Sequence, residues 1–183
     1  ELDLPADEVA ERVAEQLERF LEAAHTSDAR VSYVKLHGAL YNRAASDFDF
    51  SCRIFERIRQ VQPQLAIMAL DNSSQVKAAR HVGLGYIPEA FADRRYHADG
   101  KLVSRTQPGA IIHDTAGAVA QALAIARDRH IITSGNQVIA SGATSLCLHG
   151  DNEQALTLAR RIRDALKQAG IAIRALPLSP PTR

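Results

Sequence analysis

Apolar residues along the chain follow two patterns, helical spacing in some segments and short unbroken runs in others. Helical spacing is clearest after Pro5 and again over residues 48–58, each time with one apolar face. Short runs occupy residues 31–36, 65–70, 84–91 and 145–148. Such runs are typical of strands buried in a parallel sheet, although Pro88 weakens this interpretation for the third run.

The order of these segments predicts the fold class. Further helices are expected through Val76 and Arg80, from Asp114 to Ala126, and from a cap at Asp151 to a stop at Gly170, with a hairpin over residues 131–139. Strands and helices alternate, which predicts an α/β fold with parallel strands and right-handed crossovers. In such folds the chemistry gathers at the carboxyl ends of the strands.

Length and charge narrow the classes of function. The 183 residues predict a single domain, and the 46% hydrophobic content supplies its core. Because 22 basic side chains nearly balance 21 acidic ones, we expect neither a nucleic-acid partner nor an anionic membrane surface. No apolar run approaches the ~18 residues of a membrane span. Two cysteines, Cys52 and Cys147, suggest reduced thiols and a cytoplasmic location.

Two predicted strands end in the same way, with Leu-His-Gly at residues 36–38 and again at 148–150. This places the imidazoles of His37 and His149 at the edge of the sheet where chemistry is expected. The other histidines fall at helix or loop positions. Either residue alone is also explained as a polar side chain that satisfies nearby loop backbone, and the repetition favours function.

Side-chain alternation places Lys35 on the same face as His37. A lysine in an apolar strand needs an acidic partner or an anionic ligand, because burial of an unpaired charge is costly. Glu89, in the third predicted strand, is the carboxylate that would meet it, in an active site or in a structural ion pair. His37, His149 and Glu89 also form a set of two histidines and one carboxylate, which is known to bind a metal in hydrolytic sites. Because the three residues lie far apart in the sequence, the metal stays unknown.

A polar, turn-rich stretch from Asp93 to Pro108 is too long for a simple connector. It is either a solvated surface loop or a clamp for a carboxylate or phosphate. For a clamp, Arg94 or Arg105 would supply the guanidinium fork that matches a planar anion. The sequence contains no glycine-rich phosphate loop of Walker type, so nucleotide binding is not visible.

Four long motifs follow one another along the chain. They are VKLHGALYN at 34–42, EAFADRRY at 89–96, GKLVSRTQPGA at 100–110 and CLHGD at 147–151. Their order and spacing resemble the LamB/YcsF family, which contains the A subunit of bacterial 5-oxoprolinase. The resemblance extends from the first predicted helix to Gly170.

The resemblance implies a parallel β/α barrel of the seven-stranded type found in sugar deacetylases. It also implies ATP-dependent opening of 5-oxoproline (pyroglutamate) to L-glutamate, together with B and C subunits that phosphorylate the lactam. Whether this chain itself binds ATP stays open. By this resemblance, the catalytic residues would be Lys35, His37, Glu89 and His149. The substrate-binding residues would be Asp93, Arg94 and Arg105.

The chain departs from the family pattern in two respects. Leu36 stands where the family usually has proline, on the strand face opposite His37. Family segments of the DLN, Gly-Phe-His-Ala-Gly-Asp and His-Pro-Ser-Tyr types, which would precede strand 31–36, do not occur here. We therefore expect an incomplete barrel, about the C-terminal two-thirds of one, that is inactive alone. A second copy or a separate piece would cover the edge of strand 31–36, because an open edge strand promotes aggregation.

Opening a lactam needs a polarised carbonyl, an attacking water and a proton for the departing nitrogen. The candidates divide accordingly: Lys35 with Arg94 or Arg105 for anionic oxygens, Glu89 for the water, and His37 or His149 for the proton.

Two other functions stay open. A metal-dependent carbohydrate deacetylase or amidase would bind stoichiometric zinc at His37 and His149 and would need no ATP. A noncatalytic scaffold subunit that orders its partners would tolerate substitution of Lys35 and Glu89.

Overall fold

A computed structural model of the chain describes residues 4–149 and 155–175. The strands are β1 (Tyr33–Val34), β2 (Ala66–Leu70), β3 (Gly85–Phe91), β4 (His130–Ile132), β5 (Val138–Ala140) and β6 (Ser145–Cys147). The helices are α1 (Ala6–Thr26), α2 (Gly38–Ser46), α3 (Phe48–Val61), α4 (Ser74–His81), α5 (Thr115–Ala126) and α6 (Ala155–Gln168).

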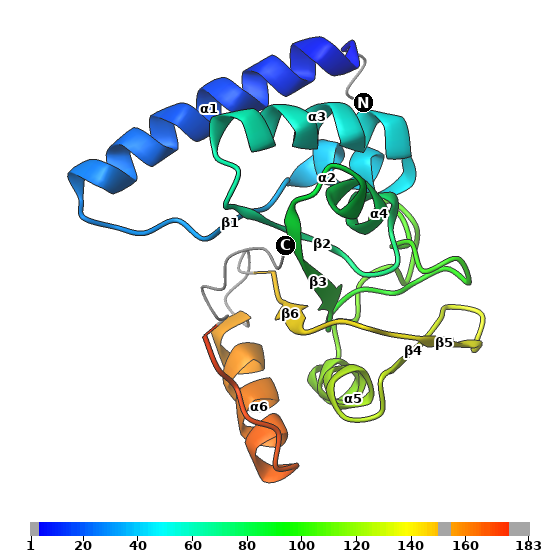
Figure 1. The fold of residues 1–183 in the computed structure, drawn as a ribbon. Helices are drawn as coiled ribbons and strands as arrows, with labels where there is room; N and C mark the ends of the chain where they lie inside the picture. Colours follow the sequence, from blue (N-terminus) through cyan, green and yellow to red (C-terminus); the bar gives the residue numbers. More distant parts are fainter. Residues whose placement is uncertain (1–3, 150–154, 176–183) are drawn as a thin grey trace. The chain divides into compact units, whose positions relative to one another are not determined.

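The strands and helices form an α/β fold (Figure 1). The main sheet has the strand order β1-β2-β3-β6, with β1 parallel to β2 and β3 parallel to β6. The strands β4 and β5 form the predicted antiparallel hairpin. The α/β class with parallel strands is therefore confirmed. Closure into a barrel is not seen among the described residues, so the seven-stranded barrel stays a prediction.

The chain divides into two compact units within β3, a first that runs to Ile87 and a second from Pro88 to Leu176. The division does not decide between one domain and two, so the single domain stays a prediction.

In the first unit, α1 and α3 lie side by side (Figure 1). The Asp47 carboxylate begins α3 by accepting a hydrogen bond from the backbone N–H of Phe50 at 3.0 Å. The apolar stripe of α3 is buried as its spacing predicts, at Phe50, Ile54, Phe55 and Ile58. The apolar spacing after Pro5 includes Phe20, which is 60% exposed, so the apolar face of α1 is not buried along its whole length.

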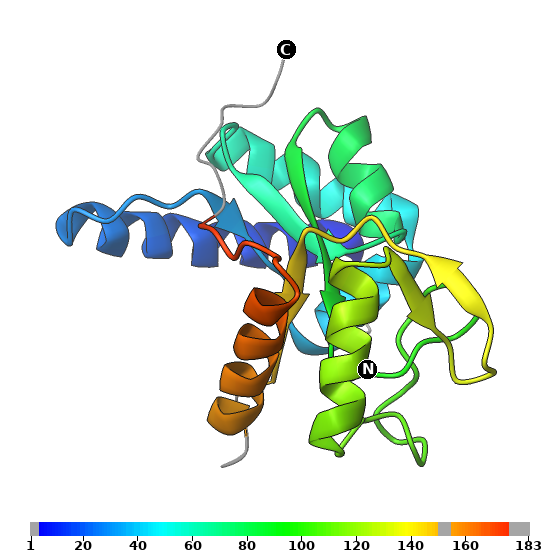
Figure 2. The same cartoon turned by 90° about the horizontal axis from the view of Figure 1, so that it is seen from below.

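In the second unit, α5 and α6 pack side by side (Figure 2). Their shared core contains Ala122, Ile162 and Leu166, together with Ala92 from the segment after β3. Asp114 caps α5 by accepting from the backbone N–H of Gly117 at 2.7 Å. The predicted cap of α6 at Asp151 lies outside the described residues.

The structure differs from the sequence-based expectation around β1. Two residues form this strand instead of the predicted six, and the chain then enters α2, which was not predicted. The chain turns into α2 at Gly38, where φ is +60°, a value that glycine adopts without strain. β1 stands at one end of the strand order, and what covers its edge stays a prediction.

Pro88 lies inside β3 without breaking it. Its carbonyl accepts a hydrogen bond from the backbone N–H of Thr144 at 2.8 Å, and the ladder to β6 begins at the next residue, Glu89. The third predicted strand is therefore confirmed despite its proline.

Within the described ranges, every helix is too short or too polar to span a bilayer. No disulfide bond joins Cys52 to Cys147 in this part of the chain.

Candidate functional site

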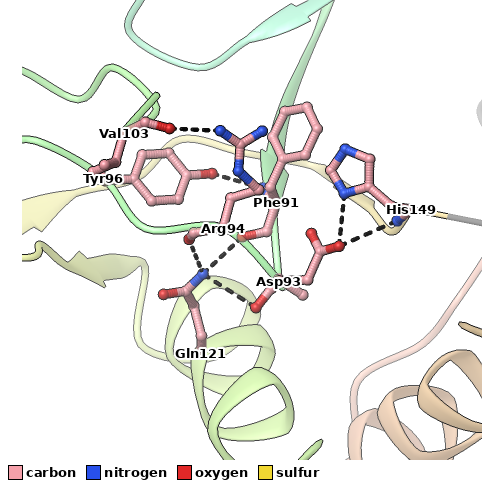
Figure 3. Close-up of polar contacts among 8 residues, drawn as sticks. Phe91, Asp93, Arg94, Tyr96, Val103, Gln121 and His149 are labelled. Atoms are coloured by element: carbon pink, nitrogen blue, oxygen red, sulfur yellow. Dashed lines mark hydrogen bonds and ion pairs between the residues drawn. The ribbon is translucent and has the colours of Figure 1, made fainter. Parts of the chain in front are cut away.

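The carboxyl ends of β3 and β6 bring two of the candidate residues together. Phe91 lies opposite Cys147 in the parallel register, so Asp93 and His149, two positions further along each chain segment, leave the sheet side by side. The Nδ1 atom of His149 lies 2.6 Å from Oδ2 of Asp93 (Figure 3). The backbone N–H of His149 donates to the same oxygen at 3.3 Å. Side-chain and backbone donors thus converge on one carboxylate oxygen.

The surroundings of this pair favour an ionised carboxylate. The Asp93 side chain is 9% exposed and that of His149 is 22% exposed. Burial acts to raise the pKa of Asp93, but the hydrogen bonds and charge of His149 outweigh it and hold that pKa below its ordinary value. An ionised Asp93 that accepts from Nδ1–H fixes the ring tautomer in which Nε2 is an acceptor.

Two further features shape the pair. The ring of Phe91 stacks on that of His149, with centroids 5.6 Å apart and planes 24° apart, which limits rotation of the imidazole. The other oxygen of Asp93, Oδ1, is buried and has no hydrogen-bond partner among the described residues. Because buried polar atoms are normally paired, this oxygen is suited to accept from a donor group of a bound molecule.

Arg94 is a buried cation that forms no ion pair with any described residue. It is 4% exposed, and its Nη2 donates to the carbonyl oxygen of Val103 at 2.6 Å (Figure 3). Its Nε is buried without a partner in the described ranges. Burial, and then the nearby charge of Arg105, lower the pKa of Arg94. A buried guanidinium with an unused donor is suited to an anionic ligand.

Arg105 differs from Arg94 in its exposure. Its side chain lies at the surface, in the turn that follows Val103. Its positive charge lies close enough to lower the pKa of Arg94, so both guanidinium groups contribute to the positive potential around Arg94.

Glu89 is 1% exposed and lies in β3 opposite Ser145. It is therefore a core position of the second unit, and its charge contributes to raising the pKa of the nearby Tyr96, for which burial is the largest cause. Tyr96 is consequently a neutral phenol, and its hydroxyl accepts from the backbone N–H of Phe91 at 2.6 Å.

Lys35 and His37 follow β1 in the first unit. Lys35 is half-buried, with its Nζ 5.6 Å from the ring centroid of Tyr41. His37 is exposed and precedes α2, and its side chain makes no capping hydrogen bond. Glu89 and His149 belong to the second unit, so their predicted meeting with Lys35 and His37 stays a prediction.

Two functional candidates were missed by the sequence analysis, Gln121 and Tyr96. Gln121 in α5 is 8% exposed, and its Nε2 lies 2.8 Å from the carbonyl oxygens of both Phe91 and Arg94 and 3.2 Å from that of Ala92. A signal was available for Gln121, because it is the one long polar side chain in the otherwise apolar sequence of α5.

The described residues contain no group of three or more His, Cys, Asp or Glu side chains that could hold a metal ion. The predicted combination of His37, His149 and Glu89 joins residues of both units, and it stays a prediction.

Comparisons with known proteins agree with the motifs. The family model described as "LamB/YcsF family" matches residues 1–180. A crystal structure of a lactam utilization protein from Thermus thermophilus is similar to this chain with a TM-score of 0.87 and 31% sequence identity, over 96% of this chain and 70% of that one. The match thus covers the segments that hold Asp93, Arg94 and Gln121. We conclude that the chain belongs to the LamB/YcsF family.

Proposed function

We propose that this chain is the A-type subunit of an ATP-dependent 5-oxoprolinase, which opens 5-oxoproline to L-glutamate together with B and C subunits. The observation that carries the proposal is the Asp93–His149 pair, with its 2.6 Å contact at the ends of two parallel strands. Membership of the LamB/YcsF family and similarity to a lactam utilization protein support a lactam as the substrate. On this proposal the partner subunits use ATP to activate the lactam.

Ring opening by water requires two proton transfers. Nε2 of His149 takes a proton as water attacks the lactam carbonyl carbon, and returns a proton to the ring nitrogen as the carbon–nitrogen bond breaks. The products are the new carboxylate and the free amine of glutamate, and the phosphate that the partner subunits place on the carbonyl oxygen leaves as inorganic phosphate when a second water attacks. Asp93 stabilises the imidazolium that forms between the two transfers, since it accepts from Nδ1 throughout.

The substrate carries a carboxylate, and the second unit offers cations for it. Arg94 binds this carboxylate through its unused Nε and remaining N–H groups, and Arg105 adds charge at the surface. The buried Oδ1 of Asp93 accepts from the lactam N–H before the lactam is phosphorylated. Glu89 assists the water. Lys35 and His37 belong to the first unit, and their catalytic roles stay predictions.

The experiment that tests this function measures glutamate release from 5-oxoproline, with and without ATP and the partner subunits. The intact complex should release glutamate only when ATP and all subunits are present, and His149→Ala and Glu89→Gln should lose turnover. Unaltered turnover in both variants would overturn the proposed site. Hydrolysis of an acetylated sugar without ATP, with stoichiometric zinc, would instead identify a metal-dependent deacetylase.

A further inference from the structure

One amide holds the segment that carries Asp93 and Arg94. The Gln121 side chain reaches from α5 to the chain just after β3, where three backbone carbonyls point at its Nε2 (Figure 3). The amide has two N–H groups and three acceptors within 3.2 Å, so at least one N–H is shared between carbonyls. Those carbonyls belong to Phe91, Ala92 and Arg94, which bracket Asp93 on both sides.

The orientation of Asp93 depends on this bracket. Its backbone conformation is set by the peptide groups on either side, and Gln121 fixes the carbonyls of the residues before and after it. On the other side of the segment, the Asp93 carbonyl accepts from the backbone N–H of Ile112 at 2.8 Å. These hydrogen bonds hold the segment in the conformation in which the carboxylate meets Nδ1 of His149 at 2.6 Å.

We propose that Gln121 is a positioning residue for the Asp93–His149 pair. Three carbonyl oxygens that converge on one point repel one another unless a donor lies between them, and the Gln121 amide is that donor. Its removal lets the Phe91–Arg94 segment relax, and a displacement of about 1 Å at a reacting group can cost about 100-fold in rate. The activity part of this inference rests on the proposed function, whereas the geometric part does not.

Two substitutions of similar size distinguish the effect of the Gln121 hydrogen-bond donors from the effect of its side-chain packing. Gln121→Met keeps the length of the side chain and removes both N–H groups. Gln121→Glu presents oxygen in place of the amide nitrogen, and as a carboxylate it repels the three carbonyls. When its carboxyl group is protonated, however, it offers one O–H donor to them. Ile125→Val, one turn further along α5 and also buried, is the matched control for a loss of packing alone.

The readouts are the ¹⁵N chemical shifts of the His149 ring and the pH profile of kcat, measured on the full chain and on its complex with partner subunits. We expect Gln121→Met to change the His149 ring shifts and to lower kcat by about 10- to 100-fold at every pH, with a smaller change in KM. Gln121→Glu should be as impaired as Gln121→Met at neutral pH, and the ratio of its kcat to that of the parent should rise as the pH falls. Ile125→Val should leave both readouts close to those of the parent.

Each result decides a specific point. Unchanged ring shifts and kcat in Gln121→Met would overturn the inference, as would an equal loss of kcat in Ile125→Val. If Gln121→Met does not fold, the pH dependence of Gln121→Glu decides alone, and a pH profile of kcat identical to that of the parent would overturn the inference. If the parent complex releases no glutamate but Gln121→Met still alters the His149 ring shifts, the positioning role stands and the proposed function fails.

Discussion

The segments that follow β3 and β1 both carry candidate site residues, yet the chain holds them in different ways. After β3, the residues from Ala92 to Arg94 are buried, Gln121 binds their carbonyls, and Asp93 is paired with His149. After β1, His37 is exposed and its side chain does not cap the helix that begins beside it. Two histidines in the same Leu-His-Gly motif thus differ in the side chains that hold them. The comparison teaches that neighbouring residues, and not the position at a strand end, make such a histidine reactive.

The largest expected effect tests this contrast directly. His149→Ala should lower kcat for lactam opening by about 100- to 10,000-fold, because it removes the proton carrier held by Asp93. The matched variant His37→Ala should lower kcat by less than about tenfold. Steady-state assays of the complete complex measure both. A larger loss in His37→Ala than in His149→Ala would reverse the comparison.

Arg94→Met should weaken substrate binding without loss of stability. Loss of a charged hydrogen bond of about 1.5–3 kcal/mol predicts a rise in KM of about 10- to 100-fold. Since the buried guanidinium makes no ion pair within the described ranges, its replacement by an apolar side chain should leave Tm unchanged or raise it. A Tm that falls by more than a few degrees would show that Arg94 stabilises the loop rather than the ligand. Arg105→Ala, at the exposed position, should change KM less.

The stability of the parent relative to Asp93→Asn should depend on pH. The pKa of Asp93 is lower in the folded chain than its ordinary value of about 3.9, so its charge stabilises the fold above that pH. This contribution is lost as the pH falls through the lower, folded-state pKa. Urea unfolding should give a difference of about 1.5–3 kcal/mol near neutral pH that shrinks below about pH 4. A difference that grows toward acid pH would contradict the sign of the shift.

The smallest effects concern the two helix caps, one in each unit. Asp114→Ala removes the cap of α5 and Asp47→Ala that of α3, and each should cost about 1 kcal/mol of stability. Neither should alter kcat at a temperature where the variant is fully folded. If Asp114→Ala lowers kcat while Asp47→Ala does not, the start of α5 as well as Gln121 positions the site.

Local patterns in the sequence predicted most elements, because each has a strong periodic or continuous apolar signal. The stripe of α3 and the run of β2 are examples. Helix α2 was missed, since its buried positions are Tyr41, Ala44 and Ala45, and two alanines give little contrast with their neighbours. The length of β1 was overestimated because apolar composition does not show where strand pairing stops.

The candidate site was predictable as a set of residues and not as a geometry. Strand-end position selected His149 and the family resemblance selected Asp93, but their contact depends on the register that places Phe91 opposite Cys147, which is a nonlocal pairing. Tyr96 and Gln121 were missed for a related reason. Each contributes a side-chain hydrogen bond to the backbone of Phe91, from 5 positions away for Tyr96 and from 30 positions away for Gln121, and the spacing of residues along the chain does not show such a partner.

The long loop after β3 is narrow at its base and open at its tip. Backbone bonds join Arg95 to Val103 and His97 to Lys101, while the turn at Asp99 and Gly100 projects beyond them. The base thus isolates the tip mechanically from Asp93, so an inserted peptide or an attached fluorophore at residues 98–100 would leave the chemistry undisturbed. For the same reason, substitutions and new contacts at residues 98–100 should be tolerated while the buried residues around Asp93 keep their positions.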